Sequence, residues 1–579
     1  MPQFALRLWP GAKRVLRIAY SVSCLLLVAA CNRATPSPTA VLPPPPTSLP
    51  VLQTTPLPTP LPTPTAGPRT FTIGLPTAPG TLDPAQAVDE SALLVTRHLY
   101  EGLTAYAPGT TRPVPALAEA WEVSADGLTW TFHLRSNARF SDGAPLTAQA
   151  AALNFERWLN RTPPGDYAFW RLMFGGFANQ ADENGAPLSL VAKAEARDER
   201  TVVLTLTRPD ASLPNTLAMP SFALVNPAAF AGKDFGAPPA RANSAGTGPF
   251  ILYNWASENI IHLARNPNYW GAPPAPDELV FKVIPDDTQR LLAVQVGEIE
   301  GMARVNPQDY AADGNHDARL EFDPPLNVLY LGFNQAREPW QNLDCRLAVA
   351  HALDKQRYVQ QFFPGDGELA VAMQPPAVWG YAAPPADRPH DPAQAVEHWN
   401  VCRSAVEFLP RSVTLYVPPV PRSYLPDPAG LGLALQTDIS TTLGINVEVA
   451  SPDWQTRWLP DVHAGRADLF VLGWSGVNGD PDSFLCPLFC GQEGAFNSDQ
   501  LGQPVPPDPE LAQLLASARA TTDPAQREAL YAQAHARLFE VVPAIPLAHR
   551  KTAWAFRADV TGYLPSPIES VFFSLVVGD

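Results

Sequence analysis

The chain has 579 residues, a formal net charge of −16 and a hydrophobic fraction of 46%. This length predicts several domains with large cores, and the composition is ordinary for a soluble protein. Residues 1–68 hold five basic residues and no acidic ones, so the remainder is more acidic than the total, which argues against nucleic acid as a partner. No stretch after residue 31 resembles a membrane span of about 20 apolar residues.

Residues 1–30 have the pattern of a secretory signal. Three basic residues precede an apolar run, which ends in small residues directly before Cys31. This arrangement resembles the lipobox of bacterial lipoproteins. By that resemblance the mature chain starts at Cys31 and is lipid-anchored at the outer face of the cell membrane or in the periplasm. A plain signal peptide followed by an unrelated cysteine is the alternative.

Residues 31–68 are predicted to be an extended linker. The segment 34–68 contains 13 prolines, many threonines and no charged residue, so it cannot form a core. In a polyproline conformation it would reach roughly 100 Å. We expect a spacer between the anchor and the folded body, with a Pro-rich recognition segment as the alternative.

The folded body is predicted to begin with a strand at 71–74. Residues 109–240 then form an α+β block, in which apolar and polar residues alternate over 129–134 and again over 202–207. Between these two strands, Thr147 is the expected N-cap of an alanine-rich helix.

Residues 241–335 differ in character from this block. Strands are expected at 280–284 and 329–333, and Asp344 is the expected N-cap of the helix that follows.

The segment 412–473 alternates between predicted strands and helices. Strands are expected at 412–417, 445–449 and 469–472. The first helix carries an apolar stripe and stops at Gly444, and a second helix is expected over 454–465. Such alternation predicts a parallel sheet with right-handed crossovers.

The stretch 467–485 combines a buried strand with a rigid loop. Its apolar run ends at Gly473, and a loop rich in glycine, with an Asp-Pro step, follows. Ligands of open α/β sheets bind at the carboxyl ends of the strands. We therefore expect this loop to be one wall of a binding site, with Trp474 as a flat apolar surface in it. A surface turn with a buried tryptophan is the alternative.

Four cysteines remain after Cys24 of the signal and Cys31 are set aside. An even number in an exported protein suggests disulfides, for which three connectivities exist. Cys486 and Cys490 form the local pair, and Cys345 and Cys402 the long-range pair. A CxxxC spacing without a neighbouring histidine is poor evidence for zinc, so no metal site is predicted.

Six motifs in one order resemble a known family. The chain is similar to the extracytoplasmic solute-binding proteins of ABC importers, in the peptide/nickel family (family 5), and most similar to the dipeptide-binding type. The resemblance covers about residues 70–579. Its motifs are DGLTWTFHLRSNARFSDGAPLTA (126–148), GTGPF (246–250), RNPNYWG (265–271), YLGFNQ (330–335), RLAVAHALDK (346–355) and GWSGVNGDPDSFL (473–485).

This resemblance implies an α/β fold of two lobes, the periplasmic-binding-protein fold of cluster C, with an extra α+β domain inserted in the first lobe. Ligand is enclosed when the lobes close about a hinge. The implied first lobe comprises 69–108, 241–335 and 546–579, the inserted domain 109–240, and the second lobe 336–545.

The resemblance also implies a ligand site. The dipeptide-binding type holds the ligand amine with an Asp in a Trp-x-x-Asp loop, and the carboxylate with an Arg after the first strand of the second lobe. The Arg matches Arg422, whose planar guanidinium suits a carboxylate; an exposed loop charge is the alternative. The Asp position falls on Val477, which cannot pair with an ammonium group. Either the ligand lacks a free amine or another residue holds it.

The remaining expected ligand residues belong to the Trp-x-x-Asp loop. Asp480 could contact the ligand, and capping of backbone amides is the alternative for it. Outside this loop, His98 lies in the part of the first lobe that faces the cleft and could bond a ligand; a structural role is the alternative. The expected loop residues are Trp474, Ser475, Gly476, Val477, Asn478 and Asp480.

The implied function is that of a substrate-binding lipoprotein of an ABC importer, a monomer without a cofactor. It captures a peptide or peptide-like solute and delivers it to the membrane subunits of a permease. Alternatives are a non-peptide solute, such as an oligosaccharide or metal complex, and a ligand-loaded sensor. A lipoprotein hydrolase competes weakly, because the motifs GxSxG, HExxH and GxxxxGK[ST] are absent; we predict no enzyme.

Overall fold

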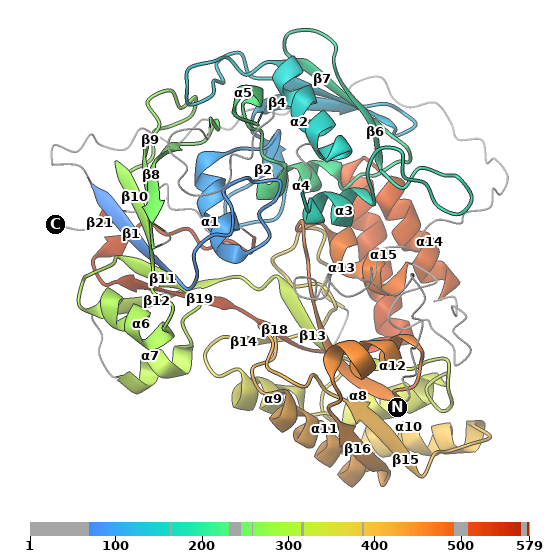
Figure 1. The fold of residues 1–579 in the computed structure, drawn as a ribbon. Helices are drawn as coiled ribbons and strands as arrows, with labels where there is room; N and C mark the ends of the chain where they lie inside the picture. Colours follow the sequence, from blue (N-terminus) through green and yellow to red (C-terminus); the bar gives the residue numbers. More distant parts are fainter. Residues whose placement is uncertain are drawn as a thin grey trace, which may run out of the picture.

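The computed structural model describes residues 69–568 and 576–577, apart from 162–164, 231–244, 258, 314–317, 385–386 and 491–507. The expected signal peptide, Cys31 and the Pro-rich linker lie outside the described residues. No helix of the described part is long and apolar enough to cross a membrane. The three larger β-sheets of the described residues form separate parts of the molecule (Figure 1).

The first lobe is built on a seven-stranded sheet with the order β12-β19-β11-β1-β10-β9-β8. β1 runs parallel to β10 and β11, and the other pairs are antiparallel. Asp89 caps the first helix by accepting a bond from the Ala92 amide. The elements are β1 (Thr70–Leu75), α1 (Glu90–Leu99), β8 (Phe250–Ser257), β9 (Ile260–Arg265), β10 (Glu278–Val283), α6 (Asp287–Gln295), β11 (Gly301–Ala303), α7 (Pro307–Asp313), β12 (Ala318–Asp323) and β19 (Thr552–Arg557).

The inserted domain has a four-stranded antiparallel sheet with the order β4-β5-β7-β6. Thr147 caps α2 as expected, by accepting a bond from the Ala150 amide. The elements within 109–240 are β3 (Pro113–Pro115), β4 (Ala118–Val123), β5 (Thr129–Leu134), α2 (Ala148–Asn160), α3 (Ala168–Phe174), β6 (Val191–Ala196), β7 (Thr201–Leu206), α4 (Leu213–Leu217) and α5 (Pro227–Phe230). β2 (Thr104–Tyr106), which precedes this segment, pairs antiparallel with β3.

The second lobe is built on a six-stranded sheet with the order β14-β18-β13-β17-β15-β16. Its strands are β13 (Asn327–Phe333), β14 (Gly367–Leu369), β15 (Ser412–Tyr416), β16 (Asn446–Ala450), β17 (Leu469–Ser475) and β18 (Ala544–Arg550). Its helices are α8 (Leu343–Ala352), α9 (Lys355–Phe362), α10 (Pro392–Ala405), α11 (Pro428–Leu443), a π-helical turn over 454–458 that leads into α12 (Leu459–His463), α13 (Pro481–Phe489), α14 (Pro509–Ala520) and α15 (Pro524–Val541).

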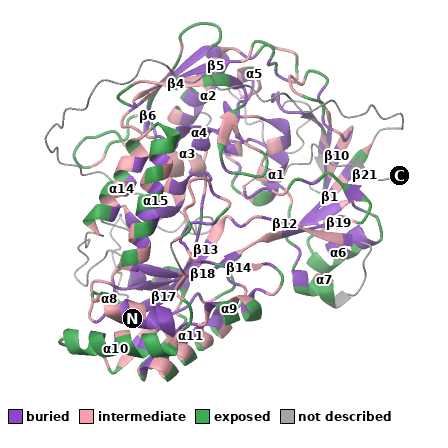
Figure 2. Cartoon of the chain, turned by 180° about the vertical axis from the view of Figure 1, so that it is seen from behind, coloured by how far each residue is buried: buried purple, intermediate pink, exposed green. Residues whose placement is uncertain are grey.

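Two cores flank the second sheet. One packs its strands against α8, α10 and α11, and the other packs the opposite face against α13, α14 and α15. Figure 2 shows the strands of this sheet as buried, whereas much of α10 is exposed. Gly444 ends α11 in the left-handed conformation that glycine adopts readily, as the sequence predicts.

The parallel strands predicted for the segment 412–473 are confirmed, and they form part of a larger mixed sheet. β15, β16 and β17 are parallel, but β13, β14 and β18 pair antiparallel. The strand expected to end before Gly473 continues to Ser475, because Trp474 and Ser475 pair with β13. The N-cap of α8 is Asn342, not Asp344, since the Asn342 side chain reaches the next two free amides.

The chain crosses between the lobes twice in the same place. β12 lies in the first sheet and β13 in the second, while β18 lies in the second and β19 in the first. The strand expected at 329–333, within the predicted first lobe, is β13 (Asn327–Phe333) and lies in the second sheet. The Asn327 side chain joins the crossings: its Oδ1 accepts from the Arg550 amide at 3.0 Å, and its Nδ2 donates to the Arg550 carbonyl at 2.7 Å. These paired crossings are suited to act as a hinge.

The cysteines of the second lobe form two disulfides. Cys345 of α8 is joined to Cys402 of α10, and Cys486 is joined to Cys490 at the end of α13. The structure thus pairs the long-range cysteines with each other and the local cysteines with each other. Among the described residues, no cluster of His, Cys, Asp or Glu could hold a metal ion.

Candidate functional site

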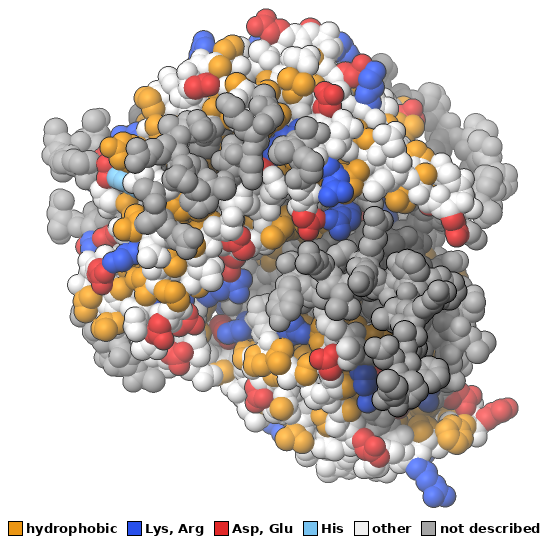
Figure 3. Space-filling model, in the orientation of Figure 1, with side chains coloured by type: hydrophobic (Ala, Val, Ile, Leu, Met, Phe, Trp, Pro, Cys, Tyr) orange, Lys and Arg blue, Asp and Glu red, His pale blue; other side chains and the backbone are white. Residues whose placement is uncertain are grey.

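A cavity of about 600 Å³ lies where the two lobes and the inserted domain meet. Leu75 and α1 line it from the first lobe, Phe169 and Met219 from the inserted domain, and Ser475 from the second lobe. Both hinge crossings also line it. Figure 3 shows Lys and Arg side chains along the hollow between the upper and lower parts of the molecule. The volume falls within the range of about 300–1,000 Å³ that is typical of small-molecule sites.

The end of β17, where the sequence analysis expects one wall of a binding site, lines the cavity from the second lobe. Ser475, Gly476 and Val477 all line the cavity. The Gly476 amide donates to the Leu326 carbonyl at 3.2 Å, and a Cβ at this glycine would lie 2.0 Å from the Phe484 ring. Only glycine fits there, so the backbone of this wall is held tightly against the hinge.

Trp474 does not line the cavity. It is 9% exposed, belongs to the core of the second lobe, and its indole Nε1 donates to the Ser483 carbonyl at 2.7 Å. Because β17 extends through this residue, neighbouring side chains point to opposite faces of the sheet. Ser475 therefore faces the cavity, and the Trp474 indole packs on the opposite face of the sheet, where it stabilises the loop.

Asn478 is buried at the contact between the second lobe and the inserted domain. Its Nδ2 donates to Thr216 Oγ1 at 3.0 Å, and its carbonyl accepts from Tyr106 Oη at 3.0 Å and from Asn215 Nδ2 at 3.3 Å. The residue is 1% exposed and is not part of the cavity wall. Its contacts tie the wall loop to the inserted domain.

Asp480 has two structural partners and no exposure. Its Oδ1 accepts from the Asp482 amide as the N-cap of α13, and both carboxylate oxygens pair with the Arg527 guanidinium at 2.7 and 2.8 Å. Burial raises the pKa of Asp480, and Arg527 opposes that rise. The side chains are 0% and 4% exposed, so this carboxylate is directed into the protein and not into the cavity.

Arg422 lies next to the cavity. Its neighbour Ser423 lines the wall, while the Arg422 guanidinium stacks on the Trp454 ring at 4.1 Å. The Arg422 Nε is buried and has no hydrogen-bond partner among the described residues. The structure therefore places this arginine beside the cavity, with its guanidinium on the Trp454 ring.

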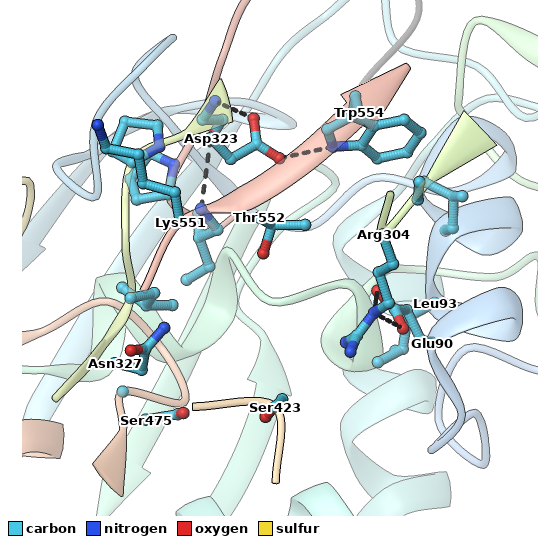
Figure 4. A pocket seen from close by; sticks show the side chains of 18 of the residues that line it. Glu90, Leu93, Arg304, Asp323, Asn327, Ser423, Ser475, Lys551, Thr552 and Trp554 are labelled. Atoms are coloured by element: carbon cyan, nitrogen blue, oxygen red, sulfur yellow. Dashed lines mark hydrogen bonds and ion pairs between the residues drawn. The ribbon is translucent and has the colours of Figure 1, made fainter. Parts of the chain in front are cut away.

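The hinge contributes charged groups that are already satisfied. Asp323 is buried and accepts bonds from Trp554 Nε1 at 2.8 Å, Tyr563 Oη at 2.7 Å and the Ser566 amide at 3.0 Å. Asp366 pairs with Arg550 Nε at 2.8 Å. Figure 4 shows the bond between Asp323 and Trp554 beside the cavity.

The wall on the first lobe carries charges that the sequence analysis does not single out. Glu90 and Arg97 of α1 and Arg304 after β11 line the cavity, and Arg304 Nε lies 2.6 and 2.5 Å from the two oxygens of Glu90. The available signal was the spacing of Glu90 and Arg97, which puts both on one helical face. His98 is buried instead; its Nδ1 lies 2.8 Å from the Leu94 carbonyl, and burial lowers its pKa to about 3.

Two lobes joined by paired crossings, with a cavity between them, define a two-lobed binding protein. Residues 112–496 match the family model of bacterial extracellular solute-binding proteins, family 5 (middle). The chain is 31% identical over 490 residues to the dipeptide-binding protein of Escherichia coli K12, covering 83% of this chain and 88% of that protein. The chain therefore belongs to the family 5 extracellular solute-binding proteins, which is a family of binding proteins and not of enzymes.

Other relatives share this architecture. The chain is 28% identical over 522 residues to heme-binding protein A of Haemophilus influenzae, covering 86% of this chain and 90% of that protein. The structure of HbpA2 from Haemophilus parasuis matches with a TM-score of 0.78 at 26% identity, covering 88% of this chain and 99% of that one. The predicted fold class, a two-lobed α/β periplasmic-binding-protein fold, is confirmed.

Proposed function

We propose that this protein captures a short peptide in the cavity between its lobes and delivers it to an ABC permease. The cavity carries this proposal: both lobes line it, the paired crossings adjoin it, and it is the size of a small-molecule site. The name of the Escherichia coli relative supports a peptide as the ligand. A ligand that contacts both walls stabilises the closed arrangement by its extra affinity for that arrangement.

The apolar residue at 477 separates this protein from the pattern of the dipeptide-binding type. Val477 lines the cavity and packs against the core of the inserted domain. A ligand amine needs a charged or polar acceptor when it leaves water, and valine supplies none. This favours either an amine held on another wall or a non-peptide solute as the second candidate ligand. The heme-binding relative is compatible with the second candidate.

The sequence supports a lipid anchor, and the family supports a permease as the partner. We propose that Cys31 carries lipid, that the Pro-rich segment spaces the body from the membrane, and that the protein acts outside the cytoplasm as a monomer. Mass spectrometry of the membrane fraction tests the anchor. Acyl groups on Cys31 support it, and an unmodified N-terminus beyond residue 31 contradicts it.

Calorimetric titration of the purified protein with di- and tripeptides tests the peptide ligand. We expect saturable binding with a rise in melting temperature, as for any ligand that binds only the folded state. Arg422→Ala tests whether Arg422 takes the ligand carboxylate, with Arg411→Ala in a loop of the same lobe as the control. Unchanged affinity in Arg422→Ala removes that role from Arg422, and no heat with any peptide contradicts the peptide ligand.

A further inference from the structure

One face of α1 presents charged ends and an apolar middle to the cavity. Glu90, Leu93, Leu94 and Arg97 all line it, and they are spaced at i, i+3, i+4 and i+7, which places them on one side of a helix. In Figure 4, Glu90, Leu93 and Arg304 lie across the cavity from Asn327 and Ser475. This face belongs to the first lobe, opposite the wall that contains Val477.

Glu90 has capacity for a further donor. Arg304 is the only described side chain that bonds its carboxylate, whereas an ionised carboxylate offers about four lone-pair sites. The two side chains are 50% and 51% exposed. A second cation can therefore join this carboxylate without leaving Arg304 unpaired.

Among the described residues, Arg97 is the cation of the cavity wall that has no carboxylate partner. Three other cations of the wall have ion pairs: Arg304 with Glu90, Arg550 with Asp366, and Lys551 with Glu368. No described acidic residue pairs with Arg97, whose Nε donates to the Leu93 carbonyl at 3.3 Å. The remaining guanidinium donors are available to a planar anion such as a carboxylate.

The separation of the two charges sets a ligand length. Seven residues of α-helix rise about 10.5 Å at about 1.5 Å per residue. An extended peptide spans about 3.3–3.6 Å per residue, so three residues span about 10 Å. Leu93 and Leu94 lie between the charges and would contact the middle of such a peptide.

We propose that the α1 face binds both ends of a tripeptide, with Glu90 taking the ammonium group and Arg97 the carboxylate. This inference rests on the proposed function and names the length and charge of its ligand. It also supplies the amine acceptor that Val477 cannot provide. The competing explanation is that Glu90 and Arg97 only complement the helix dipole, because they lie in the first and last turns of α1.

Titration of the full protein with trialanine, N-acetyl-trialanine, trialanine amide and dialanine separates these explanations. We expect N-acetylation to weaken binding to the wild type by about 10- to 100-fold, the usual range for a bond to a charged group. In Glu90→Gln, trialanine itself should bind that much more weakly, and acetylation should add little. Amidation should likewise weaken binding to the wild type, and it should add little further loss in Arg97→Gln. Dialanine should bind more weakly than trialanine to the wild type.

Glu195→Gln is the matched control, because Glu195 also forms an exposed ion pair, with Lys193, away from the cavity. It should bind trialanine as the wild type does, and all variants should melt within a few degrees of it, since exposed pairs contribute about 0–1 kcal/mol. If Glu90→Gln binds trialanine normally, or loses as much on acetylation as the wild type, the charges serve only the helix and peptide binding stands. If no peptide binds the wild type, the proposed function fails as well.

Discussion

Replacement of Asp480 by Asn separates a structural role from a ligand-binding role. The carboxylate of Asp480 is fully buried and holds both Nη atoms of Arg527 at 2.7 and 2.8 Å. It also caps α13, and Asn caps helices about as well as Asp does. Asp480→Asn therefore keeps the cap and removes only the charge that faces Arg527.

The expected cost follows from the guanidinium that remains. Removing one partner of a buried ion pair destabilises a protein by about 3–5 kcal/mol, because the other charge stays buried without compensation. Burial opposes the charge of Arg527, but Asp480 and its neighbours hold the pKa of Arg527 above its ordinary value. For a cooperative unit of the size of the second lobe, each kcal/mol lowers the melting temperature by about 2–4 °C. We expect a decrease of about 10 °C.

Thermal unfolding followed by circular dichroism, together with peptide titration at 10 °C, measures both properties. Asp482→Asn is the control, because Asp482 pairs with a partner that is 33% exposed; its decrease should be a few degrees. Asp480→Asn should bind peptide normally below its transition. An unchanged melting temperature with lost binding would refute the structural assignment and return Asp480 to the ligand site.

Three further predictions follow from buried contacts. Asn478→Ala removes the side-chain bond to Thr216 and should cost about 1–2 kcal/mol; faster hydrogen exchange in 104–106 checks it, and unchanged exchange contradicts it. Burial raises the pKa of Glu101 to about 7, against the bonds from Trp270 Nε1 and Tyr269 Oη. The folded state therefore binds more protons than the unfolded state, and up to about 3 kcal/mol of stability is lost as pH rises from about 4.5 to 7. Glu101→Gln should flatten this dependence in urea titrations, and an identical profile would exclude the residue. Loss of the disulfide between α8 and α10, which closes a separation of 57 residues, should cost about 4 kcal/mol in the chain-entropy description; equal urea midpoints with and without reductant would contradict this.

Helix caps and helix ends can be predicted from the sequence because each depends only on a few neighbouring residues. Thr147 caps α2 and Gly444 ends α11 as expected, since each needs only its own turn of helix. The α1 face has an equally local signal, because the spacing of Glu90 and Arg97 places both on one side of a helix. The order of strands in the second sheet was not readable, because antiparallel pairing of β13 with β17 joins residues more than 130 positions apart.

The sequence indicates where the cavity wall on the second lobe lies, but not which side chains form it. Ser475, Gly476 and Val477 line the cavity because the loop follows a central strand. Trp474 points into the core because β17 extends through it and pairs with β13. Asp480 is buried because it pairs with Arg527, 47 residues further along the chain. Register and long-range pairing of this kind are set by tertiary packing, which periodicity does not report.

Mass spectrometry of the solute that leaves the natively purified protein on denaturation tests the central claim most directly. A peptide captured between the lobes predicts release of short peptides, with tripeptides foremost, in a molar amount close to that of the protein. Release of a porphyrin, a sugar or a metal complex, without peptides, would contradict peptide capture and leave only the fold and the family in place.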